Sequence, residues 1–347
     1  MNEQLDISVI ISTYNRSDVL PGVIESLLAQ EADGVSFEVV IVDNNSTDGT
    51  SKVIESFKKR GERNVRSVFE PRQGVSYGRN AGIQATRAPV LAFTDDDVQV
   101  TRNWVATIKR AFDKHPQADY IGGKVLPDWQ TSLPLWATRD HWAPLAIMDY
   151  GDTPFYVSSE RRLCLLGANL AFRRSTLDAI GLFAPDLQRV KDGIGSMEDL
   201  EIQLRAWSAG KQGLYVPELA VTTEVPANRL TKAYHRRWHT GHGHFYAMLR
   251  LNEMEQSDKQ RLFDVPAHLY RQAGISLLAC LKHCLSRDFD QAFTYETQIR
   301  FFSGFFRQRR FDYLTKNRRS SFKEIKDSLR ALMVNKSLRH RDEHNSR

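Results

Sequence analysis

The chain has 347 residues, enough for one large domain or a domain with an appendage, and a formal net charge of +6. Its composition is that of a soluble globular protein, and it has no apolar run near the roughly 18 residues that cross a bilayer. Because its first residues also lack the pattern of a secretory signal, and three cysteines are too few for a disulfide framework, we expect a cytoplasmic protein.

The first 125 residues alternate short apolar runs with segments of helical periodicity, which is typical of an α/β fold. The apolar runs are unbroken, and each is followed by a helix, so they predict a parallel sheet covered on both faces. The expected strands are 6–13, 38–43, 65–70 and 88–94, and the expected helices are 17–32, a segment bearing Val53, Ile54 and Phe57, and 76–86.

Polar residues follow each of these four strands. Ligands of such sheets bind beyond the carboxyl ends of the strands, so these residues are the informative ones. One polar strand end is common, whereas four in register predict a binding site. The polar segments are 13–16, 43–48, 71–74 and 95–97.

Three consecutive aspartates, Asp95, Asp96 and Asp97, follow the fourth strand. Side chains alternate along a strand, so we expect Asp95 and Asp97 to face one way and Asp96 to turn towards its own loop or Arg79. Two carboxylates at this spacing suit Mg²⁺ or Mn²⁺ with positions left open for substrate phosphates. The alternative is a solvated loop or a helix cap.

Two familiar phosphate-binding motifs do not occur in the sequence. No G-x-G-x-x-G follows the first strand, and no P-loop motif is found, so the dinucleotide and P-loop interpretations lose their main support. A phosphate would have to be held through a metal and basic side chains, which again points to Arg79, Asp95 and Asp97.

The pattern changes between residues 122 and 223. Three tryptophans fall in a poorly periodic stretch, where either sugar stacking or packing would explain them. Glu198 and Asp199 begin a helix, where the dipole stabilises carboxylates, so capping explains one of them without any function. The tryptophans are Trp129, Trp136 and Trp142, and the expected elements are strand 163–172, helix 198–209 and strand 214–221.

Seven segments in this order make the chain similar to family 2 glycosyltransferases of the GT-A fold, over roughly residues 5 to 250. The resemblance implies an α/β fold with a mixed, mostly parallel central sheet flanked by helices. The segments are VIISTYNR (9–16), VIVDNNSTDGT (40–50), GVSYGRNAGI (74–83), LAFTDDDV (91–98), GANLAFRR (167–174), EDLEIQLRAW (198–207) and LYVPELAV (214–221).

The resemblance also implies a domain organisation. Residues 1–228 would form the GT-A domain, with a nucleotide-sugar-binding half at 1–125 and an acceptor-binding half at 126–228. Residues 229–347, which follow the last of these segments, would form a helical, basic C-terminal extension.

By the same likeness the chain would bind a nucleotide-diphosphate sugar as donor. Asp95 and Asp97 would coordinate Mg²⁺ or Mn²⁺ against the diphosphate. Family 2 enzymes characteristically invert the anomeric carbon with one catalytic base, for which we favour Asp199, with Glu198 as the alternative. The donor-binding residues implied by the resemblance are Thr13, Tyr14, Asn15, Arg16, Asp43, Asn45, Arg79, Asp95 and Asp96.

One departure from the family pattern concerns the metal site. Relatives often carry a histidine after the strand that matches residues 214–221, whereas this chain has Thr222, Thr223 and Glu224 there. The site could lack that ligand, or another side chain could supply it. The candidates are Glu224, His235, His239, His242 and His244.

The function implied is a metal-dependent inverting glycosyltransferase acting on a saccharide or lipid-linked acceptor in cell-surface polysaccharide or glycan synthesis. The alternative is a catalytically silent sugar-nucleotide-binding or scaffolding protein on the same fold. A nucleotidyltransferase would share the sheet, but the expected glycine-rich loop is missing.

The basic charge of the chain belongs to its C-terminal end. Residues 300–347 carry 14 Lys or Arg and 5 Asp or Glu, a net charge of +9. Helices with apolar and basic faces favour a peripheral membrane contact, which would place the protein at the inner face of the cytoplasmic membrane. A homodimer interface is the alternative, and we expect no nucleic-acid binding because no recognition motif accompanies the charge.

Overall fold

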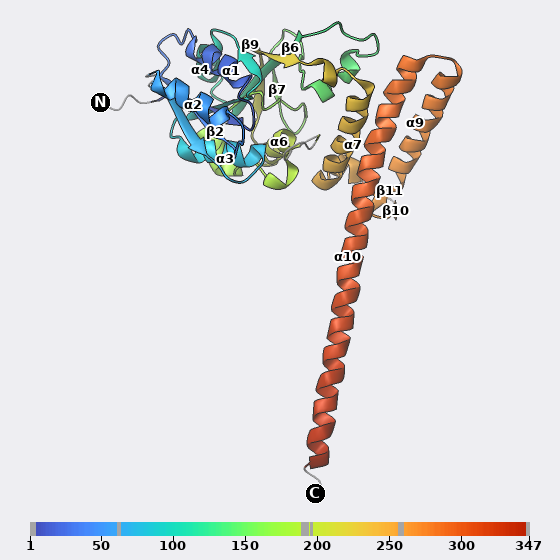
Figure 1. Cartoon of the computed structure of the whole chain (residues 1–347). Coiled ribbons are helices and arrows are strands. Elements are labelled where there is room, and N and C mark those ends of the chain that lie inside the picture. The colour runs from blue at the N-terminus through green and yellow to red at the C-terminus, as the bar shows by residue number, and fades with distance from the viewer. Residues whose placement is uncertain (1–4, 61–63, 189–193, 195–196, 256–259, 345–347) are drawn as a thin grey trace.

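The computed structural model describes residues 5–60, 64–188, 194, 197–255 and 260–344. Two parts are visible in Figure 1: a body built on one sheet, and a set of C-terminal helices beside it. In the described residues the sheet has nine strands, in the order β3-β2-β1-β4-β8-β6-β9-β5, with β7 paired to β9. The expected mixed sheet flanked by helices is confirmed.

The N-terminal half forms the parallel part of this sheet. Strand β1 pairs in parallel with β2 and β4, and β2 pairs in parallel with β3. The side chains of β1, β2 and β4 are almost entirely buried because helices cover both faces, as unbroken apolar runs predict, whereas β3 is partly exposed. The elements are β1 (Ile7–Thr13), α1 (Leu20–Leu28), β2 (Phe37–Asp43), α2 (Thr50–Lys59), β3 (Val65–Phe69), α3 (Val75–Ala85) and β4 (Val90–Thr94).

The following strands extend the sheet with mostly antiparallel pairs. Strand β8 lies antiparallel between β4 and β6, and β9 pairs in parallel with β6 and antiparallel with β5 and β7. The elements are β5 (Val98–Val100), α4 (Trp104–Lys114), β6 (Tyr120–Trp129), β7 (Phe155–Val157), β8 (Asn169–Arg173), α5 (Arg174–Ile180), α6 (Glu198–Ser208) and β9 (Gly213–Val225).

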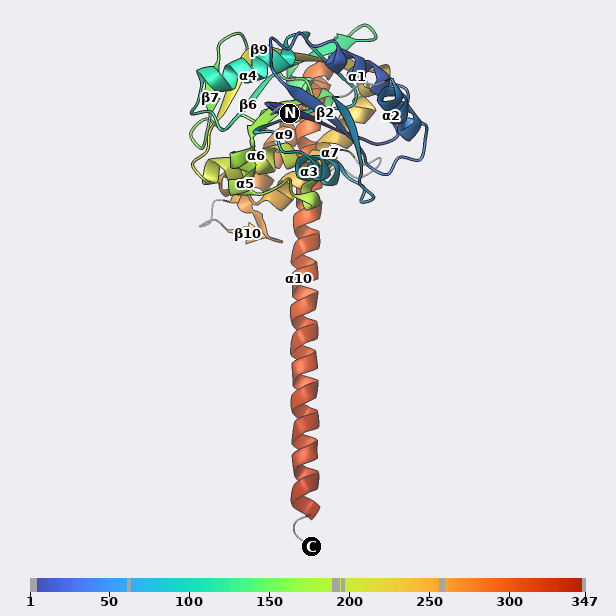
Figure 2. The ribbon, with the colours of Figure 1, turned by 90° about the vertical axis from the view of Figure 1, so that its left-hand side faces the viewer.

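The helices form a layer on each face of the sheet. Helices α1, α2 and α4 lie over one face, and α3, α5 and α6 lie over the other, as the two views in Figures 1 and 2 agree. The buried aliphatic side chains of β1, β2 and β4 join both layers in one hydrophobic core. This core fixes the ends of the strands, and therefore the loops that follow them.

The strand expected at 163–172 is wrong in its first half, since only Asn169–Arg173 pairs as β8. Backbone amides before β8 donate hydrogen bonds to side chains of α6 instead of to a neighbouring strand. The amide of Leu165 donates to Gln203 Oε1 at 2.9 Å, and the amide of Gly167 donates to Asp199 Oδ2 at 2.8 Å. An apolar composition cannot distinguish this packed loop from a strand.

The C-terminal region is helical, as expected. Helix α10 packs against both α7 and α9 and then continues beyond the body as a single helix (Figures 1 and 2). Its first part shares a small apolar core with α7 and α9 that includes Ala247, Leu269 and Phe305. The elements are α7 (Lys232–Leu249), α8 (Asn252–Glu255), β10 (Arg261–Leu262), β11 (Val265–Pro266), α9 (Ala267–Leu285) and α10 (Phe289–His344).

The three tryptophans of the irregular stretch are each half-buried and packed against other side chains. Trp129 and Trp142 lie against a second core around Val225 and Leu230. The ring of Trp136 meets the ring of His235 edge-on, with centroids 4.9 Å apart. Packing therefore accounts for these aromatic residues in the described structure.

Candidate functional site

The polar segments after β1, β2 and β4 lie at one edge of the sheet. In the parallel register Thr13 stands opposite Asp43, and Ile11 stands opposite Thr94, so the three strands end close together. This arrangement follows from the parallel sheet and confirms that the predicted strand ends share an edge.

The loops after β1 and β2 are shaped by their own polar side chains. Asn15 and Asn45 both have positive φ, 52° and 65°, a conformation that asparagine tolerates better than most residues. Asn15 Oδ1 accepts a hydrogen bond from the Thr47 amide at 2.7 Å, and Asn45 Nδ2 donates to the Pro71 carbonyl at 3.2 Å. Both residues hold the loops in place beside the edge of the sheet.

Asp43 accepts hydrogen bonds from the loop that follows it and from the start of α2. Its Oδ1 accepts from the Ser46 amide at 2.9 Å and its Oδ2 from the Ser51 hydroxyl at 2.5 Å, and the residue is buried. The neighbouring Asn44, which sequence reasoning missed, bonds the Gly74 amide through Oδ1 at 2.7 Å. A buried asparagine that joins two strand ends gives no periodic signal, so the sequence alone did not single it out.

The three aspartates occupy a turn between β4 and β5 rather than a continuing strand. The alternation expected for a strand is therefore wrong here, and Arg79 contacts Asp95, not Asp96: its Nη2 lies 3.1 Å from Asp95 Oδ1. Asp96 and Asp97 face Arg16, at 3.7 and 3.9 Å from its guanidinium. All three carboxylates thus lie against basic side chains from other segments of the chain.

Arg229 is a second residue that the sequence did not single out. It ends a short 3₁₀ helix, Ala227–Arg229, directly after β9, and its Nη2 lies 3.6 Å from Asp97 Oδ2. One basic residue within a basic region carries no distinguishing signal. The contact links the start of the C-terminal extension to the aspartate turn.

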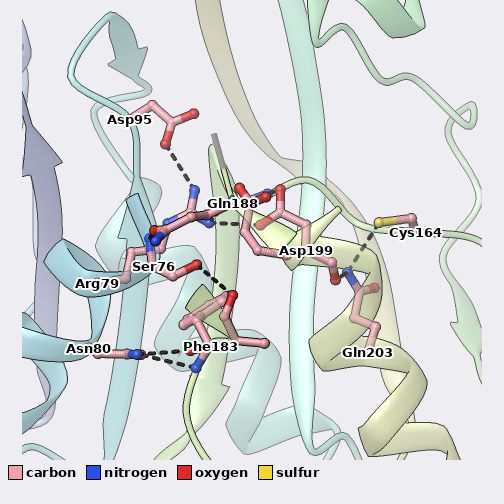
Figure 3. A network of polar contacts seen from close by, with 12 residues as sticks. Ser76, Arg79, Asn80, Asp95, Cys164, Phe183, Gln188, Asp199 and Gln203 are labelled. Atoms are coloured by element: carbon pink, nitrogen blue, oxygen red, sulfur yellow. Dashed lines mark hydrogen bonds and ion pairs between the residues drawn. The ribbon is translucent and has the colours of Figure 1, made fainter. Parts of the chain in front are cut away.

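Arg79 is the centre of a polar network that Figure 3 shows from close by. Its side chain is only 5% exposed, and its Nη1 donates to Asp199 Oδ1 at 2.8 Å and lies 3.6 Å from Glu198 Oε1. Burial by itself would lower the pKa of Arg79, but Asp199, Asp95 and Glu198 together raise it above its ordinary value. The guanidinium is therefore charged whenever the protein is folded, and it joins the aspartate turn to α6.

The start of α6 is fixed by two further contacts. Gln203 Nε2 donates to the Leu165 carbonyl at 2.8 Å and to the Asp199 carbonyl at 2.7 Å, which ties the helix to the loop before β8. That loop approaches so closely that a Cβ atom at Gly167 would overlap both the Arg79 guanidinium and the Asp199 carboxylate. Glycine is needed at this position because of the close approach.

Helix α3, which carries Arg79, is held to the segment before α6. Asn80 and Phe183 exchange two hydrogen bonds, at 2.9 and 3.0 Å, between the Asn80 amide group and the Phe183 backbone. The Ser76 amide donates to Gln188 Oε1 at 2.7 Å (Figure 3). These contacts position Arg79 opposite Asp199 independently of the ion pair.

Among the residues considered as a replacement for the histidine, Glu224 has its backbone beside the aspartate turn, because its neighbour Thr223 stands opposite Val98 in the register of β9 and β5. Glu224 pairs in the strand register with Asp128 on β6. His235 packs against Trp136 and Phe293, and His242 stacks on Trp238 with ring centroids 4.4 Å apart. Burial lowers the pKa of His235 to about 4, helped by neighbouring His141, and lowers the pKa of His242 to about 4.

The carboxylates of the turn suit a divalent cation that is shared with a substrate. In the described part of the chain, no group of three or more His, Cys, Asp or Glu side chains is arranged to hold a metal by itself. Mg²⁺ and Mn²⁺ sites that use substrate phosphates need only one or two carboxylates, which Asp95 and Asp97 could supply. Burial and the charges of Asp97 and Asp95 raise the pKa of Asp96 to about 7 despite Arg16, and a cation bound at the turn would favour the ionised form of Asp96.

Comparison with known proteins gives a consistent result. The model of the family described as glycosyl transferase family 2 matches residues 8–181, half of the chain. A glucosyl-dolichyl phosphate glucuronosyltransferase of Haloferax volcanii is 24% identical over 224 residues, 64% of this chain and 70% of the relative. Succinoglycan biosynthesis protein ExoM of Rhizobium meliloti is 25% identical over 254 residues, 70% of this chain and 75% of the relative. Other curated relatives match over about a quarter of their length.

Among solved structures, the chain is similar to a mannosyltransferase from Pyrobaculum calidifontis, described in complex with GDP-Man and Mn²⁺. The TM-score is 0.57, with 16% sequence identity and coverage of 87% of this chain and 88% of that one. At this identity the likeness supports a shared fold, including the mixed sheet described above.

Proposed function

Because this chain belongs to glycosyl transferase family 2, we propose that it moves a sugar from a nucleotide-diphosphate donor to an acceptor hydroxyl, with inversion at the anomeric carbon. Its relatives act in glycan and polysaccharide synthesis. One observation carries the proposal: Arg79 contacts Asp95 of the turn and Asp199 of α6 at the same time. Asp95 would serve the diphosphate and Asp199 would be the base, and the two carboxylates contact different nitrogens of one guanidinium.

The donor would bind over the ends of β1, β2 and β4. Thr13, Tyr14, Asn15 and Arg16 would line the nucleotide pocket, with Asn45 near the nucleoside. Asp43 would reach the nucleobase, although both of its oxygens already accept hydrogen bonds from Ser46 and Ser51. These contacts support a role for Asp43 in shaping the pocket. They support this role at least as strongly as a role in binding the nucleobase.

The diphosphate would lie beside the aspartate turn. Asp95 and Asp97 would hold Mg²⁺ or Mn²⁺, which when bound screens the diphosphate and stabilises the leaving nucleoside diphosphate. The Asp95 side chain is 40% exposed and therefore accessible to a ligand. Its neighbour Asp97 makes only long ion pairs with Arg16 and Arg229, which a bound donor could rearrange. The Arg79 and Arg229 guanidiniums would face the diphosphate or keep the carboxylates in place.

Asp199 would act as the base towards the acceptor. It would take the proton of the acceptor hydroxyl while that oxygen bonds to the anomeric carbon. The bond between this carbon and the diphosphate oxygen breaks, and its electron pair leaves with the nucleoside diphosphate. Arg79 and the Gly167 amide each hold one oxygen of Asp199, so its orientation is set before the acceptor arrives. Glu198 also lies near Arg79, at 3.6 Å, and is the alternative base.

The acceptor would be a saccharide or a lipid-linked sugar. The name of the relative from Haloferax volcanii includes a dolichyl phosphate, which supports the lipid-linked class. Lipid-linked acceptors are presented at a membrane, and we propose that the C-terminal helices make that contact. The structure has no described helix that is long and apolar enough to span a bilayer. A homodimer through the same helices is the alternative.

The proposed activity can be tested with a panel of UDP-, GDP- and dTDP-sugars. A donor that binds with Mn²⁺ should raise the melting temperature by mass action and should be turned over, at least by slow hydrolysis. Asp97→Asn should abolish the metal-dependent part of the shift, whereas Asp113→Asn should keep it. Asp113 is the matched control because it lies on α4 and pairs only with Lys109 at the surface.

Two results would contradict the proposal. If no nucleotide sugar shifts the melting temperature with metal, the donor site is assigned wrongly. If a donor binds but neither transfer nor hydrolysis occurs with any acceptor, the chain is a silent sugar-nucleotide-binding protein. Full metal-dependent activity in the Asp97→Asn variant would contradict only the assignment of Asp97 as a metal ligand.

A further inference from the structure

Helix α9 presents a row of large apolar side chains to solvent. Ile275, Leu278, Leu281 and Leu285 are 58%, 69%, 52% and 86% exposed. They are spaced three or four residues apart, so they share one face, which we call the outer face of α9. A contiguous apolar surface of this kind on a folded protein indicates a contact site.

The opposite face of α9 already has its partner within the chain. Leu269 and Ser276 are buried, and the Ser276 hydroxyl donates to Gln298 Oε1 on α10 at 2.9 Å. The rings of Tyr270 on α9 and Phe306 on α10 pack against each other, with their centroids 4.5 Å apart. The hairpin of α9 and α10 is therefore held together without the leucines of the outer face.

Basic residues accompany the outer face, and nearby acidic residues are paired. Arg271 and Lys282 lie on the exposed side of α9, each one helical turn or less from a leucine or isoleucine of the outer face. Asp288, in the turn that follows α9, lies 3.1 Å from His283 Nδ1. Asp290 lies 3.8 Å from Lys232 on α7. With Arg287 in the same turn, basic residues outnumber these two aspartates at the surface, so its net charge is positive.

We propose that the outer face of α9 lies flat on an anionic lipid surface. Apolar side chains on one face of a helix, with basic residues beside them, match the way in which interfacial helices bind anionic membranes. A second copy of the chain fits less well. A twofold contact would bring the positive charges of Arg271 and Lys282 from both copies into one interface, where they repel one another. The proposal makes specific the membrane contact suggested above, but it does not depend on sugar transfer.

The position of α9 in the molecule allows this contact. Helix α10 packs between α9 and α7, and α9 lies on the side of the molecule away from the N-terminal strands (Figures 1 and 2). A membrane in contact with α9 would therefore leave the sheet domain and its strand-end loops in water. Phe289, the first residue of α10, is 60% exposed and would extend the apolar contact past the turn.

The experiment is co-sedimentation of the full-length protein with vesicles, without donor or acceptor. The protein should sediment with phosphatidylcholine vesicles that contain phosphatidylglycerol, and less with phosphatidylcholine alone or at high salt. The double variant Leu278→Gln, Leu285→Gln should bind the mixed vesicles at least about tenfold more weakly. Phe69→Gln is the matched control, because Phe69 is 61% exposed but lies on β3.

The variants should remain folded, since the two leucines are exposed, and an unchanged melting temperature checks this. Undiminished vesicle binding by the double variant, or no binding by the unsubstituted protein, would overturn the proposal. Sedimentation equilibrium decides the main alternative. A dimer that the double substitution dissociates, together with no vesicle binding, would assign the outer face to a second copy of the chain.

Discussion

Arg79 and Asp199 lie 2.8 Å apart although 120 residues separate them along the chain. The contact joins the segment that would bind the donor to the segment that would serve the acceptor. It is accompanied by Asp95 on the other side of the guanidinium, at 3.1 Å. Because a planar guanidinium can donate in two directions at once, one residue sets the positions of both carboxylates.

Replacing Arg79 by lysine should show how much of this geometry is needed. A lysine keeps the charge, but its single ammonium cannot bridge Asp95 and Asp199 with the same geometry. We expect a loss of about 2 kcal/mol in the free energy of unfolding, because the ion pairs of a buried side chain are disrupted. Thermal or urea denaturation measures this, and Arg60→Lys is the control, since Arg60 and Glu25 form an exposed pair. Equal effects of both substitutions would contradict the special role of Arg79.

Asp199→Asn should separate catalysis from donor binding. Removing the base should lower the transfer rate by a factor of about 10² to 10⁴. The amide keeps one oxygen for Arg79 or for the Gly167 amide, so the fold and the donor affinity should change little. Calorimetry with the donor and a product assay give the two readouts. Loss of donor binding instead would move Asp199 out of the role of base, and Glu198→Gln would then be the next variant to examine.

Arg229→Gln should weaken donor binding without unfolding the protein. Its guanidinium lies 3.6 Å from Asp97 and only 20% of its side chain is exposed, so it borders the proposed diphosphate site. We expect a donor dissociation constant about tenfold higher, on the scale of one lost charged contact. The matched control is Arg237→Gln, an exposed arginine on α7. An unchanged dissociation constant would limit Arg229 to a structural contact with the turn.

Acid should destabilise the packing of α7, which carries His235, His239 and His242, before it unfolds the sheet domain. Burial lowers the pKa of His235 to about 4, of His239 to about 3 and of His242 to about 4, whereas the ordinary value is 6.5. A histidine with a lowered pKa in the folded state stabilises that state fully above pH 6.5. The contribution is lost as the pH falls from 6.5 towards 4, because the unfolded chain then binds more protons.

Fluorescence can follow this loss, because Trp136 and Trp238 contact His235 and His242. The melting temperature should fall between pH 6.5 and pH 4, and the fall should be smaller in a His235→Leu variant. His115→Leu, on the sheet domain, is the comparison variant. An identical pH profile in the unsubstituted protein and in His235→Leu would show that the buried histidines do not govern the acid transition.

The parallel half of the sheet could be predicted from the sequence because unbroken apolar runs and helical spacing are local signals. Strands at 6–13, 38–43, 65–70 and 88–94 appear within one or two residues as β1 to β4. The strand at 163–172 was wrong in its first half, since Gln203 and Asp199 satisfy that backbone from a distant helix. Contacts of this kind depend on the fold and leave no periodic trace in the sequence.

The candidate site was predicted in its residue types but not in its pairings. The resemblance named Arg79, Asp95 and Asp199, and the structure places them together. It could not name Arg229, whose proximity to Asp97 depends on where β9 ends. The orientation of Asp96 was wrong because the chain turns after Thr94, so the alternation of a strand does not continue.

The order of the strands also has a consequence for how the protein is made. Strand β4 pairs with β8, and β5 pairs with β9. The sheet is therefore complete only after β8 and β9, which are translated later than β4 and β5, have been synthesised. A nascent chain that has emerged only as far as β4 exposes an unpaired strand edge, which favours association with other chains. The aspartate turn between β4 and β5 is thus translated early, but its contact with Arg229 can form only after Arg229 has emerged from the ribosome.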